Sequence, residues 1–146
     1  MKKYAIFVLV SILAVVIAGG TLFTAYGQQV KKTEPVKDQS EFTIGRFVVA
    51  AEIKDREPVG MADKFTAGTE KVYCYLEAKN IVKDSEIFFV WIYNGKEMLK
   101  TGLSLKTGSR WRTSANKTLR GLKGDWKVEL RDASGKTLKE VNFKVE

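Results

Sequence analysis

Apolar and polar side chains alternate along most of the chain after residue 40. A period of two is typical of β-strands with one buried face, whereas an amphipathic helix repeats near every 3.6 residues, and no segment here shows a convincing helical period. The alternating apolar positions are Phe47, Val49, Ala51 and Ile53; Val72, Cys74, Leu76 and Ala78; Phe89, Trp91 and Tyr93; Leu99, Leu103 and Leu105; Trp126, Val128 and Leu130; and Val141, Phe143 and Val145. The pattern therefore predicts an all-β domain.

Turn-forming residues separate the predicted strands. Asn94-Gly95 accepts positive φ at both central turn positions and predicts a tight hairpin. Gly108 is expected to turn the chain into a strand over residues 110–114, and residues 133–135 to close a final hairpin. About seven short strands with turns at near-regular spacing favour an immunoglobulin-like antiparallel β-sandwich. A small closed β-barrel is the alternative, because the number of strands does not determine closure.

Residues 54–70 show no strand pattern and are expected to form one long loop, of the kind that often serves a function. Within it, Pro58 is expected to have a structural role, since it favours an extended conformation at Glu57. Arg56 and Glu57 offer a bidentate donor and an acceptor. Either these two side chains contribute to a binding site, or Arg56 pairs with a local carboxylate and ties the loop to the sandwich.

The first forty residues have a different composition. Lys2 and Lys3 precede an apolar stretch, and Ala25 and Gly27 then form a small-x-small pattern, which is the layout of an export signal cleaved after residue 27. Residues 4–25 carry no charge and are also long enough to span ~30 Å of hydrocarbon, so an uncleaved anchor is the alternative.

Three parts are therefore expected along the chain. Residues 1–27 are a signal peptide or transmembrane anchor helix, residues 28–40 a polar linker, and residues 41–146 the β-sandwich domain. The lysines before the apolar stretch favour a cytosolic amino terminus. The domain is then exported to the periplasm, or held on the periplasmic side of the inner membrane.

The composition excludes several kinds of chemistry. The chain contains no histidine, so it has no Ser-His-Asp triad, no Cys-His pair and no His-ligated zinc. Its one cysteine, Cys74, cannot form an intramolecular disulfide and is expected to be buried on an apolar strand face. We predict no metal site and no cofactor.

Residues 106–117 contain K-T-G, S-x-x-K and S-x-N, the signatures of serine acyl-transferases that act on cell-wall peptides. The geometry fails, because Ser114 would have to serve in two of the three motifs. Ser114 and Lys117 would also need to lie one helical turn apart, whereas strands and turns are expected here. We therefore predict no catalytic residue, and a cell-wall hydrolase remains only as an alternative.

Positive charge is concentrated in one segment. The chain has a formal net charge of +8. Lysine or arginine occupies positions 96, 100, 106, 110, 112, 117, 120, 123 and 127, against the acids Glu97 and Asp125. For an exported domain, this favours an anionic envelope polymer, a lipid head group or an envelope protein as the partner, rather than nucleic acid. A solvated basic surface is the alternative.

The tryptophans and arginines of this region suggest a division of roles. In a strand, Arg110 and Arg112 point to one face and Trp111 to the other, so Trp111 is expected in the core and the guanidinium pair outside. The alternative is that both arginines only form cross-strand pairs. Trp91 and Trp126 are expected in the core. The candidate ligand-binding residues are Arg56, Glu57, Arg110, Arg112 and Lys117.

Several landmarks together resemble the bacterial family DUF2914, a domain of unknown function near the carboxyl end of exported or membrane-tethered proteins. They are Arg46-Phe47, Arg56-Glu57-Pro58, Tyr73-Cys74-Tyr75, Trp91 with Tyr93-Asn94-Gly95-Lys96, Arg110-Trp111-Arg112 with Ser114 and Lys117, and Gly124-x-Trp126-x-Val128. The chain departs from the family pattern at Phe89-Val90, where His-Arg is expected. The resemblance implies the fold and the exported address, but no activity.

The leading hypothesis is a non-catalytic, exported β-sandwich module that binds an anionic envelope component or a partner protein through an arginine-rich face. The alternative is a purely structural or assembly domain of an envelope protein, in which the same arginines only brace the fold.

Overall fold

A computed structural model of the protein describes residues 41–146. The expected signal or anchor helix at residues 1–27 and the expected linker at residues 28–40 lie outside the described residues. Residues 41–146 contain no helix, and hence none that could cross a membrane.

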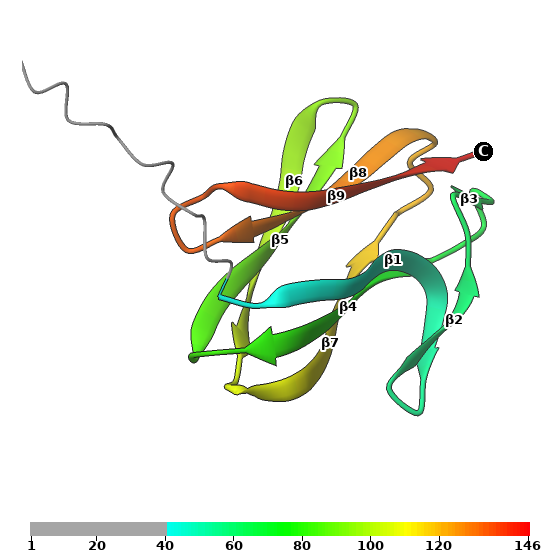
Figure 1. The fold of residues 1–146 in the computed structure, drawn as a ribbon. Helices are drawn as coiled ribbons and strands as arrows, with labels where there is room; N and C mark the ends of the chain where they lie inside the picture. Colours follow the sequence, from blue (N-terminus) through cyan, green and yellow to red (C-terminus); the bar gives the residue numbers. More distant parts are fainter. Residues whose placement is uncertain (1–40) are drawn as a thin grey trace, which may run out of the picture. The chain divides into compact units, whose positions relative to one another are not determined.

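Nine strands form two sheets that share no strand (Figure 1). They are β1 (Thr43–Lys54), β2 (Glu57–Met61), β3 (Lys64–Phe65), β4 (Lys71–Ile81), β5 (Ser85–Tyr93), β6 (Lys96–Leu105), β7 (Gly108–Thr118), β8 (Gly124–Asp132) and β9 (Thr137–Val145). The four-stranded sheet has the order β2-β1-β4-β7, and the five-stranded sheet has the order β3-β9-β8-β5-β6. All pairings are antiparallel except β3 with β9. The immunoglobulin-like sandwich is confirmed, and the closed-barrel alternative is wrong for this part of the chain.

The core lies between the inner faces of the two sheets and is rich in aromatic rings. Trp91 and Trp126 are fully buried there, where the alternation places them. The ring of Phe143 stacks on Trp126 with centroids 5.9 Å apart and meets Trp91 edge-on at 6.4 Å. Cys74 is a free cysteine in the same core, and burial raises the pKa of its thiol.

Two turns show where sequence signals were sufficient and where they were not. The Asn94-Gly95 hairpin is confirmed, with positive φ at both residues and Tyr93 paired with Lys96. Gly108 does not form the next turn, because it is already the first residue of β7. The turn before it is held by Asp84, which accepts hydrogen bonds from the backbone nitrogen of Thr107 at 2.8 Å and from its hydroxyl at 2.9 Å.

The single long loop expected over residues 54–70 is wrong. This segment contains β2 and β3. Strand β2 pairs with β1 at the edge of its sheet, and most of its side chains are exposed. Backbone pairing at an exposed edge needs no alternation of apolar residues, so the sequence pattern does not reveal such a strand.

Trp111 is not in the core as expected. It lies on the inner side of its strand, opposite Ala78, as the alternation predicts. Strand β7, however, is the edge of its sheet, so Trp111 has a neighbouring strand on one side only. The residue is 36% exposed. Alternation gives the face of a strand, but not its distance from the edge of the sandwich.

The indole nitrogens of the two core tryptophans differ in their partners, which predicts a difference in stability. Trp126 donates a hydrogen bond to the carbonyl of Leu122 at 3.3 Å, whereas the indole nitrogen of Trp91 has no partner among residues 41–146. Trp126→Phe should therefore lower the free energy of unfolding by about 1 kcal/mol more than Trp91→Phe, since both changes remove a similar ring volume but only one breaks a hydrogen bond. Urea denaturation of the two variants measures this, and an equal or larger loss in Trp91→Phe would contradict it.

Candidate functional site

A row of charged side chains crosses the outer face of the four-stranded sheet, the face turned away from the core. Glu77 in β4 is paired in register with Arg46 in β1 on one side and with Arg112 in β7 on the other. Each of these residues is the sequence neighbour of one whose side chain points inward, namely Phe47, Leu76 and Trp111. Because side chains alternate along a strand, the three charged ones point outward. The alternation that builds the core thus also sets three charges side by side on the outside.

Glu77 is the centre of this row, and its side chain is only 5% exposed. Its carboxylate accepts hydrogen bonds from Arg110, with Nε at 2.8 Å and a second, very short contact to Nη2. Arg46 lies at 3.4 Å, Lys79 at 3.5 Å and Arg112 at 3.7 Å. The bonds from Arg110, followed by those from Arg46, lower the pKa of Glu77 from 4.5 to about 2, although its burial acts in the opposite direction.

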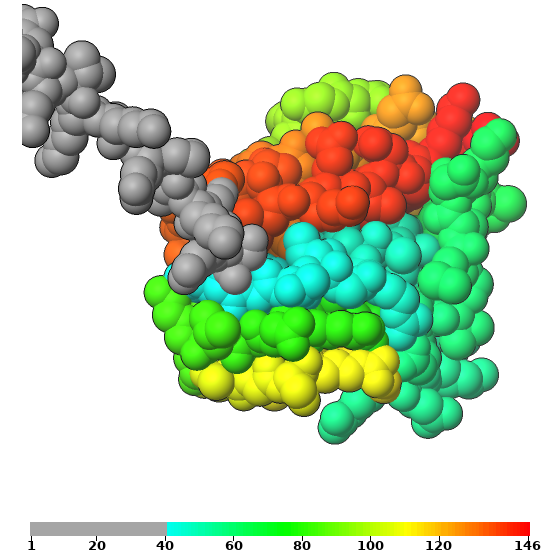
Figure 2. Space-filling model, in the orientation of Figure 1, coloured from blue at the N-terminus to red at the C-terminus, as the bar shows by residue number. Residues whose placement is uncertain are grey.

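The hairpin between β1 and β2 brings a second carboxylate over this row. Lys54 pairs with Glu57, so Asp55 and Arg56 form a two-residue turn, and both have positive φ. Glu57 lies 2.6 Å from Arg46 and 2.9 Å from Arg112, which stand on two strands on either side of β4. The hydrogen bond from Arg46 lowers the pKa of Glu57. The hairpin tip is therefore tied across the sheet to β7, and it stands beside β7 in Figures 1 and 2.

This arrangement covers Tyr75, which points outward but is only 1% exposed. The guanidinium carbon of Arg46 lies 5.1 Å from the centroid of its ring, and an Arg46 nitrogen lies 3.4 Å from its hydroxyl. Burial raises the pKa of this hydroxyl, so Tyr75 stays neutral and provides a polar floor for the site.

A hollow of about 580 Å³ lies beside this network, and we call it the arginine hollow. Its lining consists of Ile53, Arg56, Tyr75, Arg110, Trp111, Arg112, Thr113 and Ser114. Its size is within the range of ~300–1,000 Å³ that is usual for ligand sites. Arg56 is exposed at its rim and has no ion pair among residues 41–146. The neighbouring charges are Arg46, Arg56, Lys79, Arg110 and Arg112 against Glu57 and Glu77, so positive charge is in excess.

The structure brings together four of the five candidate binding residues. Arg56, Arg110 and Arg112 line the arginine hollow, and Glu57 holds Arg112 at its border. Lys117 lies elsewhere, since its ammonium donates to the carbonyl of Thr118 at 2.9 Å and lies 6.0 Å from the ring centroid of the core residue Trp126. Pro58 is buried beside Glu57 in β2.

Sequence reasoning did not assign three residues to this site, although two of them, Arg46 and Tyr75, are among the landmarks of the family resemblance. Arg46, Tyr75 and Glu77 all lie on predicted strands, at positions that alternate with core residues. This alternation could have assigned them to the outer face. It could not have shown that they share a row, because the register between strands comes from tertiary pairing.

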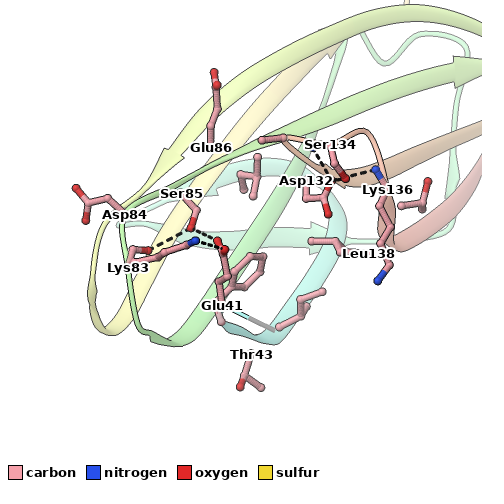
Figure 3. Close-up of a pocket in the computed structure, with 15 residues that line it drawn as sticks. Glu41, Thr43, Lys83, Asp84, Ser85, Glu86, Asp132, Ser134, Lys136 and Leu138 are labelled. Carbon is pink, nitrogen blue, oxygen red and sulfur yellow. Dashed lines mark hydrogen bonds and ion pairs between the residues drawn. The ribbon is translucent and has the colours of Figure 1, made fainter. Parts of the chain in front are cut away.

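A second hollow, of about 910 Å³, lies at the end of the sandwich where β1 begins (Figure 3). Three separate segments line it, namely the start of β1, the β4–β5 turn and the β8–β9 turn, so no single sequence motif indicates it. Glu41 accepts one hydrogen bond there from the Ser85 hydroxyl at 2.7 Å and pairs with Lys83 at 2.5 Å. The charged residues that line this hollow are four acids, Glu41, Asp84, Glu86 and Asp132, and two lysines, Lys83 and Lys136, so it lacks the positive excess of the arginine hollow. In the part of the chain that the structure describes, no His, Cys, Asp and Glu side chains are grouped to hold a metal.

The model of the family described as protein of unknown function (DUF2914) matches residues 84–145. The resemblance to DUF2914 is thereby confirmed. The DUF2914 match spans β5–β9 and includes Arg110 and Arg112. The landmarks Arg46-Phe47, Arg56-Glu57-Pro58 and Tyr73-Cys74-Tyr75 precede the matched residues, so half of the site lies outside the DUF2914 match. No curated protein matches the sequence.

Solved structures with similar strand arrangements include an immunoglobulin-like protein from Pseudomonas aeruginosa, with 16% identity and a TM-score of 0.49 over 75% of this chain and 99% of that one. A β-glucosidase from Listeria innocua has 9% identity and a TM-score of 0.46, and one from Erythrobacter marinus has 6% identity and a TM-score of 0.49. These cover 71% and 72% of this chain, but it spans only 15% of either enzyme. At such identities and TM-scores the likenesses carry no inference about function.

The buried carboxylate of Glu77 predicts a specific acid sensitivity. Because its pKa is lower in the folded state than its ordinary value of 4.5, its contribution to stability is complete above pH 4.5 and is lost as the pH falls towards about 2. Glu77→Gln should lower the free energy of unfolding at pH 7 by about 1–3 kcal/mol, because three arginines lose the negative charge at their centre and the amide NH2 group is itself a donor. Chemical denaturation across this pH range should then show a shallower acid loss in the variant than in the wild type. Parallel pH curves for the two proteins would contradict the assignment.

Proposed function

We propose that residues 41–146 form a non-catalytic binding module that holds an anionic component of the cell envelope, or an acidic surface of a partner protein, in the arginine hollow. One observation carries this proposal. Arg56 lies far from Arg110 and Arg112 in the sequence, yet all three line one hollow where arginines outnumber carboxylates. Guanidinium groups bind carboxylates and phosphates in a bidentate manner, so this chemistry suits an anionic partner.

The backbone at Arg56 adds support. Its φ of 60° is in the left-handed region, which costs a residue with a Cβ roughly 1 kcal/mol and is readily adopted by glycine. Its side chain recovers none of this cost through an ion pair within residues 41–146. A contact between its charge and a ligand would explain why an arginine occupies this position, although it strains the turn and has no ion-pair partner there.

The proposed location is the periplasm or the periplasmic side of the inner membrane. The apolar stretch behind Lys2 and Lys3 and the resemblance to DUF2914 support this location.

A structural or assembly role is the second candidate, and one observation favours it. Arg110 and Arg112 are both engaged by Glu77, and Arg112 also by Glu57. Under this proposal the arginines only keep a buried carboxylate neutralised. Arg56 distinguishes the two candidates, because it contributes to the hollow without a part in this bracing.

Substitution of Arg56 by glycine separates binding from stability. We expect Arg56→Gly to leave the free energy of unfolding unchanged or to raise it by up to about 1 kcal/mol, because it relieves the left-handed turn. The same change should weaken low-salt binding to anionic vesicles, wall fragments or polyglutamate by roughly tenfold, because it removes the unpaired guanidinium. Sedimentation or calorimetry at two salt concentrations measures the binding.

Arg120→Gly is the matched control. Arg120 is also an exposed arginine with positive φ in a tight turn, closed by the bond from Leu122 N to Leu119 O, but it does not line the hollow. The control should gain similar stability and bind like the wild type. Equal binding by all three proteins would refute the anion site and leave the structural role.

A further inference from the structure

The arginine hollow lies along an edge strand. Five consecutive residues of β7, Arg110 to Ser114, form one side of it, and Ile53 and Arg56 of the hairpin between β1 and β2 form the other. Strand β7 is the last strand of its sheet, so the backbone groups on its free side have no strand partner among residues 41–146. The arginine hollow therefore runs beside the free edge of β7, where a further strand would pair with it.

The four edge strands of the described residues differ in how they are protected. Strand β2 is short and contains Pro58, and β3 has only two residues. Strand β6 is interrupted by a bulge opposite Trp91 and Ile92. Strand β7 has 11 residues, no proline and no register shift against β4. Natural sheets usually block edges by the devices seen in β2, β3 and β6, so the free edge of β7 stands out as a surface for pairing.

We propose that the partner is an extended acidic segment of another polypeptide, which adds to the sheet as a strand beside β7 and under the tip of the hairpin. This inference rests on the anion-binding function proposed above and identifies its ligand. Main-chain hydrogen bonds to β7 would provide affinity, and side chains on alternate faces would provide specificity.

The side chains of β7 indicate the sequence of that segment. Arg110 and Arg112 are two residues apart on the outer face, so acidic side chains at i and i+2 of the added strand would face them. Between them, Trp111 turns to the other face and is 36% exposed, so an apolar side chain at i+1 would cover it. The preferred ligand is therefore acidic, apolar and acidic at successive positions.

Two features limit where this strand can lie and what it can be. Lys117, at the far end of β7, points inward over Trp126, and an inward charge of this kind protects an edge, so pairing is confined to the end near Arg110. A second copy of the domain would bring the same arginines against Arg110 and Arg112, and like charges opposite one another are unfavourable. Charge complementarity thus favours an acidic peptide over self-association.

The test uses the full chain and three capped peptides of the same length. The first alternates glutamate and valine, the second has the same composition with its glutamates in one block, and the third is the alternating peptide with N-methyl groups on its backbone. We expect the N-methylated peptide to bind at least about tenfold more weakly than the unmethylated alternating peptide. It keeps the same charges but cannot donate main-chain hydrogen bonds to β7. The block peptide should also bind several-fold more weakly, and Trp111→Ala should reduce affinity for the alternating peptide but not for polyglutamate.

Hydrogen exchange locates the contact. Amides of β7 near Arg110–Ser114 should exchange more slowly when the alternating peptide is bound, and those of the edge strand β6 should not change. At a peptide concentration that half-saturates the wild type, Arg56→Gly should reduce this protection, and Arg120→Gly should preserve it.

The outcomes separate this inference from the proposed function. If N-methylation has no effect and β7 exchange is unchanged, while Arg56→Gly still weakens binding, the anion site stands and strand addition is wrong. If only anionic vesicles bind in an Arg56-dependent way, the ligand is a lipid surface and the inference also fails. If nothing binds in an Arg56-dependent way, both proposals are wrong.

Discussion

The carboxylate of Glu77 is withdrawn from water on the outer face of a sheet, and the arrangement around it follows from the need to neutralise it. A buried carboxylate without partners is strongly destabilising, so Arg46, Arg110 and Arg112 must converge on it. Such pairs add little net stability over an apolar substitute, because desolvation offsets the attraction. They do specify the register. A slip of one residue in β1 or β7 would turn an arginine into the core.

The five-stranded sheet also has a buried glutamate on its outer face that is held by basic side chains, but the balance of charge around it is different. Glu129 is nearly buried on its outer face and lies 2.9 Å from Lys127 and 2.7 Å from Arg131. Burial raises its pKa, but these two cations outweigh the effect and lower it. The same cations also pair with Glu140 and Glu97, so acids outnumber bases there. The surplus of positive charge at the arginine hollow is therefore not a general requirement for holding a carboxylate on a sheet surface, and it suggests a role beyond bracing.

The fold was predictable from the sequence where side chains determine it, and less so where backbone pairing does. Alternation at Val72–Ala78 and at Trp126–Leu130 identified core strands, because one face of each must be apolar. Alternation did not identify β2, because its backbone pairing with β1 does not require one face of the strand to be apolar. At the site, the sequence indicated Arg110 and Arg112 through their spacing. It could not indicate Glu77, because a glutamate on the outer face of a strand is unremarkable until the register places arginines on both sides of it.

The burial of Cys74 has a practical consequence. Its thiol is the only one in the chain, it has no exposed surface, and its raised pKa leaves almost no thiolate at neutral pH. Oxidants and thiol reagents should reach it only when the two sheets separate, so the native domain is protected from covalent dimerisation in an oxidising compartment. The same property makes the rate of alkylation at this position a direct report of how often the whole sandwich opens.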